Sequence, residues 1–170
     1  MPLARLLLVV ALTTSCAPVV KLTSGEPTPA GTQPVRLNDL AFERPAKFAL
    51  RDFGNGVGLS FCVERDVRSC GSLSVVLPGD LRAEQCRDPV AVAAWLKGAM
   101  QKAPELEPAT VAGLHGWLHD GKDVSFPTLV LCAPEGAWRI STFYWGPKAE
   151  GPARGAFRMF METARFVPAG

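Results

Sequence analysis

Alternation of apolar and polar side chains over residues 57–77 constrains the fold of this chain more than any other feature. Apolar side chains occupy the odd-numbered positions over residues 57–63 and again over 73–77, which is the period of a strand with one buried face. If Cys62 lies opposite Cys70, every odd-numbered apolar side chain falls on one side and the serines fall on the other. Because a slip of one residue would reverse every side chain, we predict an antiparallel hairpin in this register, with a disulfide between Cys62 and Cys70.

The first sixteen residues have the pattern of a cleaved leader. Arg5 precedes an apolar run over residues 6–12, and small residues stand directly before Cys16. The run is shorter than the about 20 residues of a membrane-spanning helix but has the length of a signal's apolar region. Residues 12–16 resemble the lipobox of bacterial lipoproteins. This resemblance implies that residues 1–15 are a signal peptide and that Cys16 becomes the mature N-terminus, carrying diacylglycerol with acyl chains such as palmitate. The alternative is an ordinary secretory signal, which would leave Cys16 as a spare thiol or remove it.

The cysteine count agrees with lipid on Cys16. The chain has five cysteines, so lipidation leaves an even number, suited to two disulfides in an oxidising compartment. Four cysteines allow three pairings; with Cys62 joined to Cys70, Cys86 pairs with Cys132 by elimination. The CxxC spacing of redox motifs does not occur, which disfavours a redox role.

The resemblance also bears on location. Ala17 follows Cys16, whereas an Asp at that position would mark inner-membrane retention in Gram-negative lipoproteins. We therefore expect the protein in the cell envelope, anchored by its lipid to the outer membrane and facing the periplasm if the host is Gram-negative.

Composition divides the rest of the chain into two parts. Residues 16–36 are rich in Pro, Thr and Gly and predict a flexible tether after the lipidated cysteine. Residues 37–170 have the length of a single domain. The chain carries 18 basic and 16 acidic side chains without a basic run, so we expect no nucleic-acid partner.

Periodicity places further elements around the hairpin. We expect a strand over residues 40–50 that bends at Pro45, a helix from Pro89 to the residue before Pro104, and a strand over residues 110–119. Strands over 127–133 and 138–145 and a helix from Pro152 follow. The strand over 138–145 carries aromatic side chains on both faces, which predicts a central strand covered on both sides. The predicted fold class is α+β, with a central antiparallel sheet of about six strands flanked by two main helices.

Three segments extend this prediction: Phe42–Ala46, Val111–Gly116 and Ala156–Phe166. In this order of elements they resemble the PsbP/Mog1-like domains found in several small bacterial lipoproteins. The resemblance implies an α/β/α sandwich, and a non-enzymatic binding or assembly module in place of a catalyst.

Catalytic and metal-binding patterns are weak. His115 and His119 would share one face of a strand about 13 Å apart, too far to bind one ion, and no HExxH or GxSxG motif occurs. We therefore expect no catalytic residue, no cofactor and no metal.

The leading hypothesis is a lipid-anchored module that binds an envelope protein or a small apolar ligand. Its candidate binding residues are Trp117, Tyr144 and Trp145, provided that they form an exposed patch; the alternative is that they lie under the two helices. A second hypothesis is a structural envelope protein without a defined ligand. A third is a cryptic hydrolase or metal-binding protein using His115 and His119.

Overall fold

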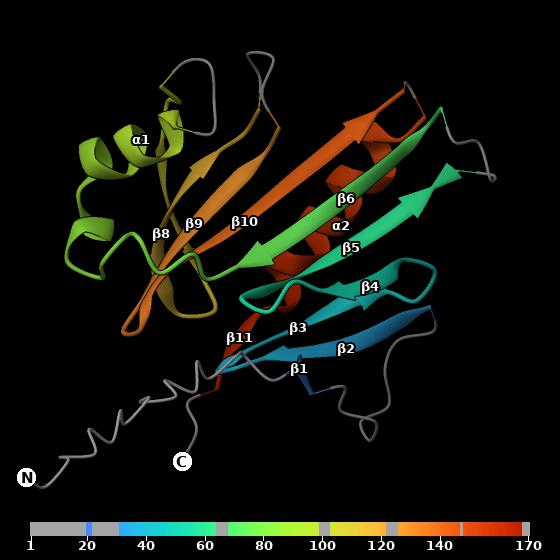
Figure 1. The fold of residues 1–170 in the computed structure, drawn as a ribbon, viewed down its shortest axis with the longest axis horizontal. Helices are drawn as coiled ribbons and strands as arrows, with labels where there is room; N and C mark the ends of the chain where they lie inside the picture. The colour runs from blue at the N-terminus through green and yellow to red at the C-terminus, as the bar shows by residue number, and fades with distance from the viewer. Residues whose placement is uncertain are drawn as a thin grey trace, which may run out of the picture.

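The computed structural model describes residues 20–21, 31–63, 68–98, 103–121, 126–146 and 148–167. They form an α+β fold, as predicted, with two sheets and two α-helices (Figure 1). The main sheet is antiparallel and has seven strands, where about six were expected, in the order β4-β5-β6-β10-β9-β8-β7. These strands are β4 (Ala49–Asp52), β5 (Gly56–Cys62), β6 (Cys70–Val76), β7 (Glu107–Val111), β8 (Leu114–His119), β9 (Thr128–Ala133) and β10 (Gly136–Trp145).

The β5–β6 hairpin has the predicted register. Cys62 lies opposite Cys70, and Leu59 lies opposite Leu73. Within these two strands, the odd-numbered apolar side chains are buried, and only Phe61 is half-buried. This confirms the predicted core side of the hairpin. The Cys62 and Cys70 sulfurs are 1.97 Å apart, and those of Cys86 and Cys132 are 2.04 Å apart. Both are disulfide distances, in the predicted pairing.

A second sheet has the order β1-β2-β3-β11. It consists of β1 (Val20–Lys21), β2 (Thr32–Leu37), β3 (Leu40–Pro45) and β11 (Arg165–Phe166). The predicted tether over residues 16–36 is therefore wrong at its end, because β2 begins at Thr32 and buries Val35 and Leu37 almost completely. Residues 1–19 and 22–30, which include the predicted signal peptide and Cys16, lie outside the described residues.

Two segments predicted as single strands are each divided. Residues 40–50 form β3 and β4 in different sheets, because β3 ends at Pro45 and a turn follows in which the Phe48 amide donates to the Pro45 carbonyl. Residues 110–119 belong to a hairpin, β7 and β8, whose turn residues Ala112 and Gly113 have φ of 57° and 76°. Two positive φ values favour a tight hairpin turn, and Ala112 gives no sequence signal for one.

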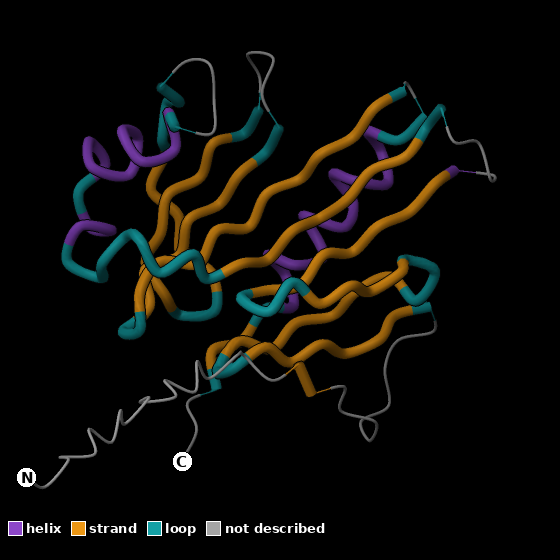
Figure 2. The backbone as a smooth tube through the Cα atoms, in the orientation of Figure 1, coloured by secondary structure: helices purple, strands orange, loops and turns teal. Residues whose placement is uncertain are grey.

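The helix α2 (Glu150–Thr163) packs on one side of the main sheet. It contacts β3, β6 and β10, and in Figures 1 and 2 it lies behind the strands β5, β6 and β10. Its Phe160 is fully buried, with its ring centroid 5.0 Å from that of Phe42 in β3. The main core therefore lies around α2, between the two sheets.

The helix α1 (Pro89–Lys97) packs on the opposite side of the main sheet, next to the 3₁₀ helix η2 (Gln85–Arg87). Asp88 caps α1 as its sequence predicts, its Oδ1 accepting a hydrogen bond from the Val90 amide at 2.9 Å. Val92 and Leu96 of α1 pack against Val130 of β9 in a second, smaller core. α1 lies over the β8–β9 end of the sheet, and no described helix lies over the other end of this side (Figure 1).

The strand β10 is central in the main sheet, as predicted, but it is covered on both sides only along its first half. Ala137 and Trp138, which lie on opposite sides of the strand, are both buried, whereas Phe143 and Trp145 are 51% and 47% exposed on the side turned away from α2. No helix among the described residues is long and apolar enough to cross a membrane.

Candidate functional site

A surface that we call the open face lies on the side of β4, β5, β6 and β10 turned away from α2 (Figure 1). Ladder partners fix which side chains stand on it. No helix lies over it among the residues that the structure describes. The polar, charged and aromatic side chains of the open face are Arg51, Phe53, Ser60, Ser72, Ser74, Arg139, Ser141, Phe143 and Trp145. The same registers also place Ala49, Val76 and the Cys62–Cys70 pair on this side, with Cys70 opposite Trp145.

Four serines occupy the centre of the open face. Ser60 lies opposite Ser72, and Ser74 lies opposite Ser141 in the next row, with Cβ atoms of each pair about 5 Å apart. Ser60 is exposed and the others are half-buried. Each hydroxyl can donate one hydrogen bond and accept two, so the serines form a compact block of hydrogen-bonding groups.

Aromatic side chains stand on two sides of the serines. The rings of Phe143 and Trp145 are 5.8 Å apart at one side. On the other, the ring of the 48% exposed Phe53 lies over Gly58, since a Cβ built there would be 2.6 Å from the ring. Because Gly58 has no side chain, the Phe53 ring can pack directly on the sheet at this position.

The charge of the open face is positive. The Arg51 Cζ atom lies 5.8 Å from the Phe53 ring centroid, and the Arg139 Cζ atom lies 5.5 Å from that of Trp95 in α1. Within the described strands no carboxylate side chain projects from this face, and neither arginine has an ion-pair partner among the described residues. Two positive charges thus stand on the face of the serine hydroxyls, and no acid of the described strands compensates them.

The three aromatic residues chosen from the sequence do not come together. Trp117 is half-buried beneath η2, its Nε1 donating to the Cys86 carbonyl at 2.7 Å. Tyr144 lies on the α2 side of β10, where it hydrogen-bonds Glu150 of α2. Of the three, Trp145 alone belongs to the open face.

Sequence reasoning missed the other members of the open face. Phe143 shares its parity with Trp145 on one strand and was therefore accessible to the alternation argument. Phe53 lies in a turn between two strands, where no periodicity assigns a side to it.

The two histidines lie in different environments. His115 is exposed, with its ring 4.9 Å from that of Trp117. His119 is buried, with Nδ1 3.1 Å from the Glu105 carbonyl oxygen. No group of three or more His, Cys, Asp or Glu side chains in the described part of the chain could hold a metal ion.

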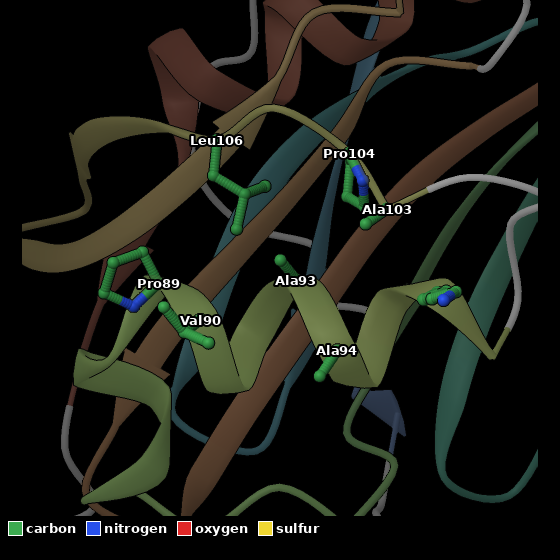
Figure 3. A pocket seen from close by; sticks show the side chains of 8 residues that line it. Pro89, Val90, Ala93, Ala94, Ala103, Pro104 and Leu106 are labelled. Atoms are coloured by element: carbon green, nitrogen blue, oxygen red, sulfur yellow. The ribbon is translucent and has the colours of Figure 1, made fainter.

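A shallow hollow of about 420 Å³ lies between α1 and residues 103–106 (Figure 3). Side chains of α1 form one wall, and Ala103, Pro104 and Leu106 form the other. Among the described lining residues, Lys97 alone is charged. The hollow is otherwise apolar, and nothing in the described residues indicates which molecule would fill it.

The groups whose pKa values are shifted lie away from the open face. Hydrogen bonds from Arg154 and then from Tyr144 lower the pKa of Glu150 at the start of α2, and the Arg154 Nε and Glu150 Oε1 atoms are 2.8 Å apart. Burial lowers the pKa of Arg44 in the second sheet.

The open face has the groups for binding by stacking, hydrogen bonding and charge. The nearest histidine along its rows is His119, two strands from Ser141, or about 10 Å. No family model matches this chain, and none of the curated proteins does.

Proposed function

We propose that this protein is a lipid-anchored, non-catalytic binding module of the cell envelope, and that the open face is its binding surface. The observation that carries the proposal is the combination of three half-exposed aromatic side chains with two arginines that lack ion-pair partners within the described residues. Exposed aromatic side chains gathered on one surface are characteristic of interaction sites.

The leader sequence and the disulfides support the envelope location. The lipobox-like residues 12–16 imply an anchor on Cys16, and two acyl chains hold a protein stably on a membrane where one does not. Two disulfide pairs suit an oxidising compartment such as the periplasm. In a Gram-negative host, the module would stand on the periplasmic side of the outer membrane.

We also propose that the domain is a variant of the PsbP/Mog1-like sandwich. An antiparallel sheet with helices on opposite sides and a long helix near the C-terminal end support this assignment. The second sheet would be an addition to that arrangement.

Intact-mass spectrometry tests the anchor. The full chain, produced in a Gram-negative bacterium and extracted from membranes, should have a mass that begins at Cys16 plus acyl chains. Four alkylations should appear only after reduction, and the Cys16→Ser variant should leave the membrane fraction. An unlipidated mature chain, or thiols that react before reduction, would contradict the anchored, disulfide-bonded form.

Site-specific photo-crosslinking in intact cells tests the binding surface. A photoreactive phenylalanine at position 143 of the anchored protein should give a discrete crosslinked product. The same probe at position 158, which is exposed on α2, is the matched control. Loss of the product on Trp145→Ala would support the open face. The same products from both positions, or none from position 143, would favour a structural protein without a defined ligand.

A further inference from the structure

We propose that the open face binds an acidic polysaccharide, a linear chain of sugar rings that carries carboxylates. This inference rests on the proposed function of the open face as a binding surface. It adds the chemical class of the ligand, which follows from three properties of the face: flat aromatic rings, a block of hydroxyls, and positive charge without acids.

The aromatic side chains match the apolar faces of sugar rings. A pyranose ring exposes C–H groups on its faces, and these pack flat on an aromatic ring with release of water. Phe53 lies over Gly58 on β5, whereas Phe143 stands on β10, and β6 lies between these strands. Two strand spacings across the sheet and an offset of two residues along the strands separate these positions by about 12 Å, a span for a short chain of sugar rings.

The serines lie where the hydroxyl groups of such a chain would fall. Ser72 and Ser74 stand on β6 between the two aromatic groups, with Ser60 and Ser141 beside them. Serine hydroxyls both donate and accept, as sugar hydroxyls do, so either partner can adjust its hydrogen-bond direction. These side chains are short and leave the sheet surface flat.

The arginines indicate that the polysaccharide is acidic. Arg51 is exposed beside Phe53, and Arg139 is half-buried at the border with α1. Arginine binds carboxylates through two parallel hydrogen bonds. Since the described strands place no carboxylate on this face, an anionic chain would meet attraction along its length.

An acidic peptide fits these observations less well. An extended peptide gains affinity by pairing its backbone with a free strand edge. β5 and β6 are neighboured by strands on both sides, and β10 is paired on both sides as far as Ser141, so the centre of the open face around the serines offers no such edge. A peptide would use the arginines and leave the serine block without a matching partner.

Isothermal titration calorimetry on the mature, lipidated protein in detergent micelles tests the inference. Pentagalacturonate and a mannuronate pentamer are the probes, and neutral galactopentaose is the matched sugar. We expect at least one acidic probe to bind about tenfold more tightly than the neutral one, and binding to weaken with added salt. Trp145→Ala should weaken binding about tenfold, the effect expected from the loss of one stacking contact. Arg51→Gln should reduce the dependence of the affinity on salt. Val90→Ala and Arg158→Gln, which change exposed side chains on the two helices, should leave binding unchanged.

Several results would overturn the inference. Failure of both acidic probes, equal affinity for galactopentaose, or binding that Trp145→Ala does not weaken would each do so. If hexaglutamate binds, loses affinity on Trp145→Ala, and the acidic sugars do not bind, the ligand is a peptide and the open face keeps its binding role. The proposed function itself fails separately, in the photo-crosslinking comparison of positions 143 and 158.

Discussion

Gly58→Ala should weaken binding and leave stability nearly unchanged, whereas Gly56→Ala should lower stability and leave binding intact, although both glycines lie in β5. A Cβ at Gly58 would meet the Phe53 ring at 2.6 Å, whereas a Cβ at Gly56 would meet the Val75 carbonyl oxygen at 2.3 Å. The half-exposed Phe53 side chain can rotate away, but the backbone of β6 cannot move without disturbing the sheet.

The magnitudes follow from what must move. For Gly58→Ala, the smaller entropy of the unfolded chain offsets the lost Phe53 contact, so the free energy of unfolding should stay within about 1 kcal/mol of the parent value. For Gly56→Ala, overpacking against backbone should cost about 2–3 kcal/mol, or about 8 °C in Tm for a domain of this size.

Urea unfolding under non-reducing conditions, followed by tryptophan fluorescence, measures both free energies. Titration of the same two variants with the acidic pentamer that binds the parent measures their affinities, and these test whether Phe53 lies on the open face. Gly58→Ala should weaken binding as much as Phe53→Ala does, whereas Gly56→Ala should retain binding at temperatures where it is folded. Equal destabilisation by both substitutions, or unchanged binding by Gly58→Ala, would refute the placement of Phe53 on the open face.

Three further predictions concern the scaffold. Replacing both Cys86 and Cys132 by serine should lower the free energy of unfolding by about 4 kcal/mol, and the same change at Cys62 and Cys70 should lower it by about 2.5 kcal/mol. The difference arises because the first pair is 46 residues apart and the second 8, and a crosslink across the longer loop removes more entropy from the unfolded chain. Chemical denaturation of the two double variants measures both losses. Phe160→Ala should lower the free energy of unfolding by about 3–5 kcal/mol, measured by urea unfolding, and a loss below 1 kcal/mol would contradict its central place in the core. Because the pKa of Glu150 is lowered in the folded state from 4.5, its contribution is present above that pH and is lost as the pH falls through the lowered value; Glu150→Gln should therefore have a lower Tm than the parent at pH 7 and an equal Tm in strong acid.

The hairpin register could be predicted because several constraints agree on it. Alternation selects the buried side, and the cysteine positions select the pairing, so Cys62 and Cys70 meet where expected. The apolar stripe of α2 was readable for the same reason, since Ala153, Ala156 and Phe160 recur at helical spacing and are buried.

Other parts had no such signal. β2 lies in a segment whose Pro and Thr content is typical of tethers, and its Val35 and Leu37 become buried only because β3 and α2 provide a surface. The β7–β8 turn requires positive φ at Ala112, which the residue type does not announce. The open face depends on how far α1 reaches across the sheet, and this is a property of tertiary packing.

Chemical-shift mapping of the ¹⁵N-labelled mature chain tests the central claim most directly. Titration with pentagalacturonate and with the mannuronate pentamer should, for at least one of them, shift amide signals of β5, β6 and β10 around Ser60, Ser72 and Phe143, together with Phe53. The signals of α1 and its hollow should stay unchanged. Shifts confined to α1 would contradict the open face as the binding surface of this protein, and no shifts with either acidic pentamer would overturn its assignment to an acidic polysaccharide.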